Sequence, residues 1–152
     1  EPQLQRRDKD AIAAIGRMGA AAGAVLETLL EYGDTDSDPL LQKVVFEALG
    51  QIGDPGATQL LATKLVHGPE QVRPAAARAL GLIGDPRAVR PLATVLEEGD
   101  DPTVRGAAAA ALRDIATESA LETLAAHADD GAPVVAQHAA AAAAAVTHTP
   151  SA

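Results

Sequence analysis

Apolar residues in the middle of the chain recur at the spacing of an α-helix. Five of them stand at i, i+4, i+7, i+8 and i+11 and therefore share one helix face. They are Val72, Ala76, Ala79, Leu80 and Ile83. Directly after this stripe come Gly84, Asp85 and Pro86, which are typical of a left-handed helix end, a helix cap and a first helical turn. The pattern predicts that one helix ends and the next begins at these residues.

The segment around this junction occurs twice. Residues 49–57 read L-G-Q-I-G-D-P-G-A, and residues 80–88, 31 positions later, read L-G-L-I-G-D-P-R-A. A weaker copy follows after another 32 positions, where Leu112 and Ile115 take the places of Leu80 and Ile83. A period of this length is typical of arrays of paired helices in which each unit contacts only its neighbours.

The pattern predicts about nine helices in one repeat domain, 1–146. After an apolar stripe that ends at Gly19, the expected helices span 20–32, 40–52, 55–67, 69–83, 86–98, 101–115, 117 or 118–128 and 133–146. They define a half repeat, 1–19, and repeats over about 20–53, 54–84, 85–116 and 117–146, with a disordered tail at 147–152. Pro74 is near enough to its helix start to be tolerated. Pro91 is expected to kink its helix, because it removes a backbone hydrogen bond.

Glycines at equivalent places lie inside two of the expected helices. Gly50 and Gly81 each cost about 1 kcal/mol relative to alanine. We expect another helix to approach too closely there for a Cβ atom. Other residues expected to have structural roles are the helix ends Gly53 and Gly84 and the caps Asp54 and Asp85.

Charge and composition narrow the range of partners. The net charge is −9, from 21 acidic and 12 basic residues, and a surface of this sign repels nucleic acid. There are no cysteines, so disulfides and thiolate metal sites are excluded. We find no apolar run long enough to span a bilayer and expect a soluble, cytoplasmic protein.

The seven alanines 139–145 leave the last helix without a polar face, so either more protein follows or this helix self-associates.

The junctions and their spacing resemble HEAT repeats, in particular the short subtype called phycobilisome-lyase-like. The matching pattern is V-R-x-A-A-x-x-A-L-G-x-I-G-D-x-x-A-V, which begins at Val72. Later repeats depart from it, with Arg113 in the place of Gly81 and Ala116 in the place of Gly84. In the last helix Ala143 replaces the expected leucine. The resemblance implies an all-α fold, a right-handed α-solenoid of antiparallel helix pairs whose second helices line the concave side.

The exposed side of these second helices is the predicted binding surface for a protein or peptide partner. The residues expected to contact the partner are Lys43, Glu47, Gln51, Gln71, Pro74, Arg78, Leu82, Thr103, Asp114, Gln137 and His138. Between them lie Leu40, Val44, Ala75, Gly106, Ala107, Ala110, Val134, Ala141 and Ala145. Alternatively, more of the alanines are buried than this facing implies. The other functions considered are a bilin lyase or isomerase subunit, implied by the subtype's name, and a regulatory accessory domain of a larger enzyme.

Two arginines occupy matching places near the starts of second helices. Arg73 and Arg105 each follow a valine. They could form a ladder that binds anions. The interpretation we favour is structural, with each arginine bonded to a turn carboxylate, Asp54 or Asp85, of a neighbouring unit.

An acidic turn precedes the helix at 40–52. Asp34, Asp36 and Asp38 alternate as the first ligands of a calcium loop do. Pro39 stands where such a loop needs glycine, and Val45 replaces its closing glutamate. A cap for the following helix is therefore the preferred interpretation of this turn.

The histidines show no pattern of a catalytic metal site. His67, His127, His138 and His148 include no His-Glu pair, whereas the deoxyhypusine hydroxylases, iron enzymes built on HEAT repeats, carry paired His-Glu motifs. No serine or lysine nucleophile has a partnered base nearby in sequence. The sequence therefore predicts a scaffold that is not an enzyme and that has no cofactor.

Overall fold

The computed structural model describes residues 38–147, and every regular element in this range is a helix. The α-helices are α3 (Pro39–Ile52), α4 (Thr58–His67), α5 (Arg73–Ile83), α6 (Val89–Glu98), α7 (Pro102–Ile115), α8 (Glu118–Ala125) and α9 (Pro133–Thr147). Short 3₁₀-helices, η2 (Pro55–Ala57) and η3 (Pro86–Ala88), precede α4 and α6. The predicted half repeat 1–19, the helix 20–32 and residues 148–152 lie outside the described residues.

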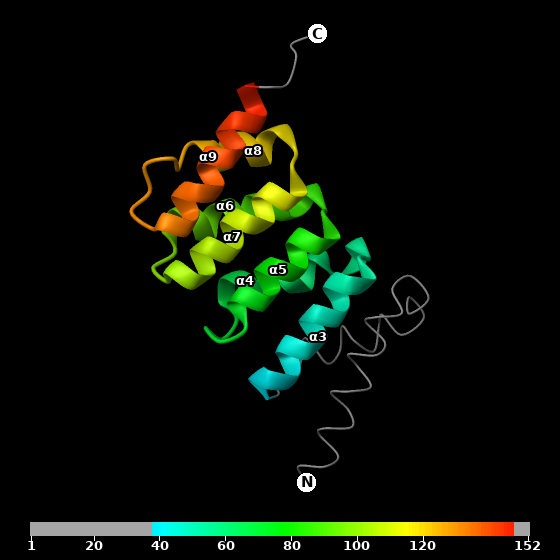
Figure 1. Cartoon of the computed structure of the whole chain (residues 1–152). Coiled ribbons are helices and arrows are strands. Elements are labelled where there is room, and N and C mark those ends of the chain that lie inside the picture. The colour runs from blue at the N-terminus through cyan, green and yellow to red at the C-terminus, as the bar shows by residue number, and fades with distance from the viewer. Residues whose placement is uncertain (1–37, 148–152) are drawn as a thin grey trace.

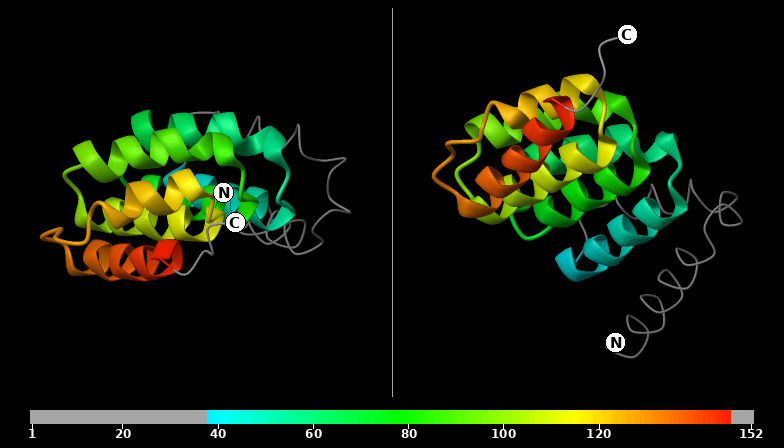
Figure 2. Two further views of the ribbon diagram at one scale, coloured as in Figure 1. Left: turned by 90° about the horizontal axis from the view of Figure 1, so that it is seen from above. Right: turned by 45° about the horizontal axis from the view of Figure 1, so that its top comes forward.

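The helices stack in two layers (Figures 1 and 2). Helices α3, α5, α7 and α9 lie side by side in one layer, which we call the B layer. Helices α4, α6 and α8 form the A layer behind it. Each A-layer helix packs on the B-layer helix that follows it in sequence, α4 on α5, α6 on α7 and α8 on α9. The described part of the chain is therefore an α-solenoid of antiparallel helix pairs, as the sequence predicts.

Leucines fill the space between the two layers. Those that are fully buried are Leu49, Leu61, Leu65, Leu80, Leu92, Leu96, Leu112 and Leu124. Each contributes about 1.5–3 kcal/mol relative to an exposed side chain. They come from every helix except α9, whose buried residues are Val135, Ala139 and Ala142.

The junctions between repeats have the predicted caps. Gly53 and Gly84 end α3 and α5 in the left-handed conformation, with φ of 74° and 73°. The next residues, Asp54 and Asp85, each accept a hydrogen bond from the backbone N–H two positions on, at 2.8 and 3.0 Å. At the third junction Ala116 adopts the left-handed conformation instead, with φ of 57°. A Cβ atom in this region costs roughly 1–2 kcal/mol.

Gly50 and Gly81 each lie at a close contact between neighbouring B-layer helices. A Cβ atom built on Gly50 would lie 3.0 Å from the Cα atom of Ala79 in α5. The equivalent atom on Gly81 would lie 3.0 Å from the Cα atom of Ala111 in α7. The close helix contact expected from the sequence is therefore present at both glycines.

Pro91 lies in the first turn of its helix and not well inside it, contrary to the prediction. The segment 86–98 is divided into η3 and α6, so Pro91 is the third residue of α6, where a missing N–H leaves no helical bond unmade. The segment 55–67 is divided in the same way, although Leu60 stands at the place of Pro91. The Asp-Pro turn, and not Pro91, therefore sets the division.

Two other predicted helix boundaries are also wrong. Helix α5 begins at Arg73 and not at 69, because Pro74 lacks the N–H that a longer helix would use. Helix α8 ends at Ala125 and not at 128. Beyond it, the His127 and Ala128 N–H groups bond to carbonyls three positions back, at 3.0 and 3.3 Å, which tightens the chain into turns.

Candidate functional site

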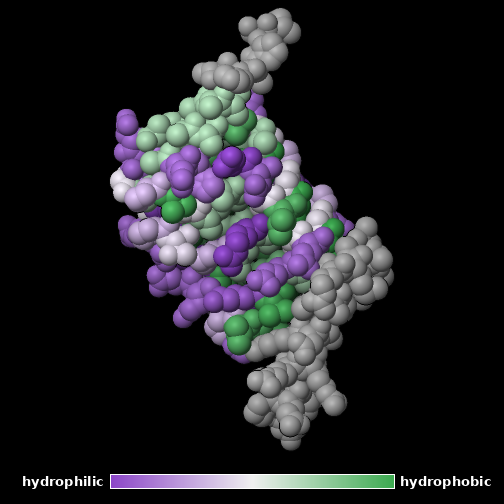
Figure 3. All heavy atoms as spheres, viewed as in Figure 1, coloured by the Kyte–Doolittle hydropathy of each residue, from purple (hydrophilic) through white to green (hydrophobic). Residues whose placement is uncertain are grey.

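The exposed side of the B layer carries the large apolar side chains that remain accessible to solvent. Among the described residues these are Leu40, Leu82 and Val134, which are 55%, 63% and 50% exposed. They come from α3, α5 and α9. Figure 3 shows polar and apolar side chains mixed across this face.

A groove of about 500 Å³ crosses α5, α7 and α9 on this side. We call it the B-layer groove. Its lining residues are Pro74 and Arg78 from α5, Pro102, Thr103, Gly106, Ala107 and Ala110 from α7, and Val134 and His138 from α9. The structure thus brings together residues of three successive helix pairs at one concave site.

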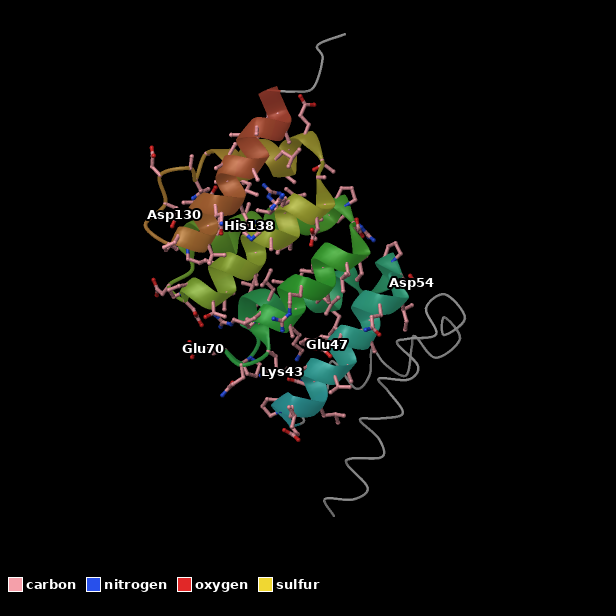
Figure 4. The ribbon with its side chains drawn as sticks, in the orientation of Figure 1. Lys43, Glu47, Asp54, Glu70, Asp130 and His138 are labelled. Carbon is pink, nitrogen blue, oxygen red and sulfur yellow. The ribbon has the colours of Figure 1, made fainter. Side chains whose placement is uncertain are left out.

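Four of the predicted partner contacts line this groove: Pro74, Arg78, Thr103 and His138. The other predicted contacts lie on the four B-layer helices or in the turn before α5 and do not line the groove. They are Lys43, Glu47, Gln51, Gln71, Leu82, Asp114 and Gln137. Figure 4 shows Lys43 and Glu47 on α3, away from His138 on α9. Pro102 also lines the groove, although it was not predicted; it directly precedes Thr103 at the start of α7.

Ala75 does not face solvent, contrary to the prediction. It is 1% exposed, because α5 has B-layer neighbours on both sides as well as α4 beneath it. Gly106, predicted to be on the same exposed surface, is also buried although it lines the groove. The alternative that more of the alanines are buried than expected is therefore correct for Ala75.

The floor of the groove consists of small residues of α7. Gly106, Ala107 and Ala110 carry at most a methyl group. A Cβ atom on Gly106 would lie 3.2 Å from Cγ1 of Val134, so the glycine also lets α9 approach α7. Because these side chains are short, a ligand could come close to the α7 backbone here. Longer side chains on the floor would prevent this approach.

The polar groups of the groove are one arginine, one threonine and one histidine. Arg78 is exposed, and within residues 38–147 it forms no ion pair or hydrogen bond through its guanidinium. Nδ1 of His138 is buried without a hydrogen-bond partner in the same range. No carboxylate lines the groove. Arg78 therefore gives the groove a positive charge, whereas the net charge of the chain is −9.

A second polar cluster holds the last helix pair to the preceding one. Arg105 donates from Nε to the Leu96 carbonyl at 2.9 Å and from both terminal nitrogens to the carboxylate of Asp130. Asp130 also accepts from the Ala132 N–H at 2.9 Å and lies 3.4 Å from Nδ1 of His127. The Arg105 guanidinium, aided by the Ala132 N–H, holds the pKa of the Asp130 carboxyl well below its usual range.

Asp85 forms the corresponding link between the repeats on either side of it. Its carboxylate accepts from the Thr58 hydroxyl at 2.8 Å and from Nε of Arg87 at 2.9 Å. These bonds, with the side-chain bond from Arg87 as the largest cause, lower the pKa of Asp85 to about 2. Arg87 in addition donates to the Pro55 carbonyl at 3.2 Å. The Asp85 side chain is 7% exposed, so this network is structural.

The partners expected for Arg73 and Arg105 are therefore wrong. Arg73 donates from Nε to the Gly68 carbonyl at 2.9 Å and does not bond Asp54 or Asp85. Both aspartates cap their own turns, and the partner of Arg105 is Asp130. The sequence did not indicate Asp130, because it lies 25 positions away in a turn whose length differs from that of the earlier repeats.

The described residues contain no cluster of three or more histidine, cysteine or acidic side chains that could hold a metal ion. Asp38, the described member of the calcium candidates, accepts from the Leu40 N–H at 3.0 Å and so caps α3. Asp34 and Asp36 lie outside the described residues. No helix in the described range has the length and apolar character needed to cross a bilayer.

Comparison with known proteins gives a match of residues 61–145 to the family described as HEAT repeats. The match covers 85 of the 152 residues. Among solved structures, human deoxyhypusine hydroxylase in complex with glycerol is similar at a TM-score of 0.70 and 32% sequence identity. The similarity covers 81% of this chain and 43% of the hydroxylase, so this chain spans less than half of that protein. No curated protein sequence matches the chain.

The similarity to the hydroxylase corrects one prediction. The sequence led us to expect that the chain is not an enzyme, because it lacks paired His-Glu motifs. A solved structure that it resembles is nevertheless that of an enzyme with a similar helical fold. The absence of those motifs was therefore insufficient ground to exclude an enzymatic function.

Proposed function

The chain belongs to the HEAT-repeat family, and we propose that it is a helical scaffold whose B-layer groove binds a segment of another protein. The observation that supports this most directly is the groove itself. Three successive B-layer helices form it from small side chains, with proline and valine at its sides. A concave surface of this kind suits a peptide or a single helix, because the partner's backbone can approach closely while its side chains contact the edges.

The exposed apolar side chains of the B layer favour the same function. Leu82 and Val134 stand on the first and last helices of the groove, and both are at least half exposed. Exposed apolar groups that surround a concave surface are typical of interaction sites. Binding of a partner would remove them from water.

Peptides selected on the purified protein from a random library would test the proposal. Selected peptides should bind the Ala110→Arg variant at least about tenfold more weakly than wild type, because the long side chain occupies the floor of the groove. The matched control is Gln59→Arg, at an exposed position of α4 in the other layer, and it should bind as wild type does. Undiminished binding to Ala110→Arg would show that the groove is not the site.

We also propose that the repeats are of the short phycobilisome-lyase-like subtype. The spacing of 31 and 32 residues between equivalent positions supports this. A bilin lyase or isomerase subunit has no further support from the described residues. Absorbance titration of the chain with bilins would reveal such a function.

A second candidate function, as part of an enzyme, is supported by the similarity to human deoxyhypusine hydroxylase. No His-Glu pair occurs in the sequence, and residues 38–147 do not fit a metal ion, so we derive no catalytic step through one. The test is to incubate the chain with a deoxyhypusine-containing peptide, ferrous iron and air. Gain of one oxygen atom by the peptide, measured by mass spectrometry and absent from the same mixture without the chain, would establish catalysis. No gain, with groove-dependent peptide binding intact, would favour the scaffold.

A further inference from the structure

We infer that the B-layer groove is selective for acidic peptide segments, whose carboxylate pairs with Arg78 beside the small-residue floor. This inference rests on the proposed binding function and adds the chemistry of the partner. The occupant is a short segment with an acidic side chain next to small or apolar residues.

Arg78 is the charged group that a ligand in the groove would meet first. It lines the groove from α5, its side chain is exposed, and no carboxylate in the described range forms an ion pair with it. Glu47 stands at the matching position of α3, but no ion pair joins the two. By contrast, Arg87 and Arg105 are both bonded to aspartates of this chain. Arg78 is therefore available for a carboxylate of a partner.

The charges of the residues that line the groove favour an anionic ligand over a cationic one. The nine lining residues include no aspartate and no glutamate, although acidic residues outnumber basic ones by 21 to 12 in the whole chain. A cationic peptide would meet Arg78 without any compensating carboxylate. An acidic one gains a charge-assisted hydrogen bond that its neutral counterpart lacks.

His138 provides a second polar group, on the opposite side of the groove from Arg78. Figure 4 shows it on α9, at the border with α7. Its Nδ1 atom is buried without a partner in the described range, and no hydrogen bond holds the ring. Buried polar atoms are normally paired. A ring that is not held in this way can turn to bond a ligand, so a carboxylate or a peptide carbonyl in the groove would give it a partner.

The size and lining of the groove suit a peptide with compact apolar residues. Pro74, Pro102 and Val134 give apolar walls, and the α7 floor has no side chain longer than a methyl group over Gly106, Ala107 and Ala110. Apolar side chains of the peptide would contact these walls while the carboxylate lies at Arg78. The apolar contacts give affinity, and Arg78 gives selectivity.

The experiment compares two capped six-residue peptides that differ only in having two glutamates or two glutamines among alanines and leucines. Each is titrated into the ¹⁵N-labelled full chain and followed by NMR. We expect the glutamate peptide to bind about tenfold more tightly, and Arg78→Gln to abolish this preference. The matched control is Arg90→Gln, at an exposed arginine of α6 in the other layer, and it should keep the preference.

The outcomes separate the inference from the function on which it rests. Equal affinity for the two peptides, both lost in Ala110→Arg, would overturn the acidic selectivity and leave the groove as a binding site. Failure of the glutamate peptide to bind also overturns the selectivity, whereas peptides selected from the random library still test the groove separately. Shifts of groove signals on dilution without peptide would place a second copy of this acidic chain there and overturn the inference.

Discussion

The contact between α5 and α7 predicts that Gly81→Ala destabilises the protein, although alanine is the better helix former. An added Cβ atom would lie 3.0 Å from the Cα atom and 3.2 Å from the Cβ atom of Ala111, and 3.2 Å from Oδ2 of Asp114. The aspartate can turn away. The Ala111 backbone belongs to α7 and moves only with that helix, so the two helices must separate by a few tenths of an ångström.

Two opposing terms set the size of the effect. Replacing glycine by alanine inside a helix is favourable by about 1 kcal/mol. Forcing an extra methyl group into a tightly packed contact costs typically about 1–3 kcal/mol. We expect the free energy of unfolding to fall by about 1 kcal/mol, equivalent to a decrease in melting temperature of about 2–4 °C for a protein of this size.

Urea denaturation at 25 °C measures this change. The control is Gly131→Ala, where nothing lies within 4 Å of the new Cβ atom, and it should be neutral or slightly stabilising. If Gly81→Ala raised the stability by about 1 kcal/mol, the helix propensity alone would account for it. The explanation of this glycine by close helix contact would then be refuted.

Two further predictions concern the repeat junctions. Ala116→Gly should stabilise the protein by about 0.5–1 kcal/mol in the same assay, because it relieves a left-handed alanine, φ 57°, at the place that glycine takes in the other junctions; a loss of stability would contradict this. Folding lowers the pKa of Asp85 to about 2 and also lowers the pKa of Asp130. The two carboxylates therefore contribute fully to the free energy of unfolding when the pH is above their pKa in the unfolded chain, about 3.9, and this contribution is lost as the pH falls towards 2. The Asp85→Asn/Asp130→Asn double variant should therefore lose less stability than wild type between about pH 4 and pH 2. An equal loss in the two proteins would show that these carboxylates do not contribute to the pH dependence of stability.

The fold could be predicted from the sequence because its signals are local. Gly84, Asp85 and Pro86 determine the backbone at a junction without help from distant residues, and the apolar stripe from Val72 to Ile83 indicates which side is buried. The helical glycines also carried long-range information, since a glycine inside a helix has few explanations other than close packing. The contacts at Gly50 and Gly81 follow from this.

The details of the site could be predicted only in part, because they depend on how neighbouring repeats are placed. Helical periodicity put Arg78 and His138 on the exposed side, but could not show that they line one groove while Lys43 does not. It also placed Ala75 at the surface, where the adjacent helices bury it. The pairing of Arg105 with Asp130 depends on the length of the turn after α8, for which the earlier repeats give no precedent.

The contact between neighbouring B-layer helices is less extensive where the repeats depart from their pattern. Gly50 and Gly81 let α3, α5 and α7 stack closely, whereas Arg113 takes the equivalent place in α7. The contact between α7 and α9 is the least extensive of the three B-layer contacts in residues 38–147, and both helices line the groove. The side chain of Arg113 is exposed, and α9 comes close to α7 at Gly106, where an added Cβ atom would lie 3.2 Å from Cγ1 of Val134. Gly106 and Val134 both line the B-layer groove, so the groove crosses the B-layer contact at which the glycine of the earlier repeats is missing.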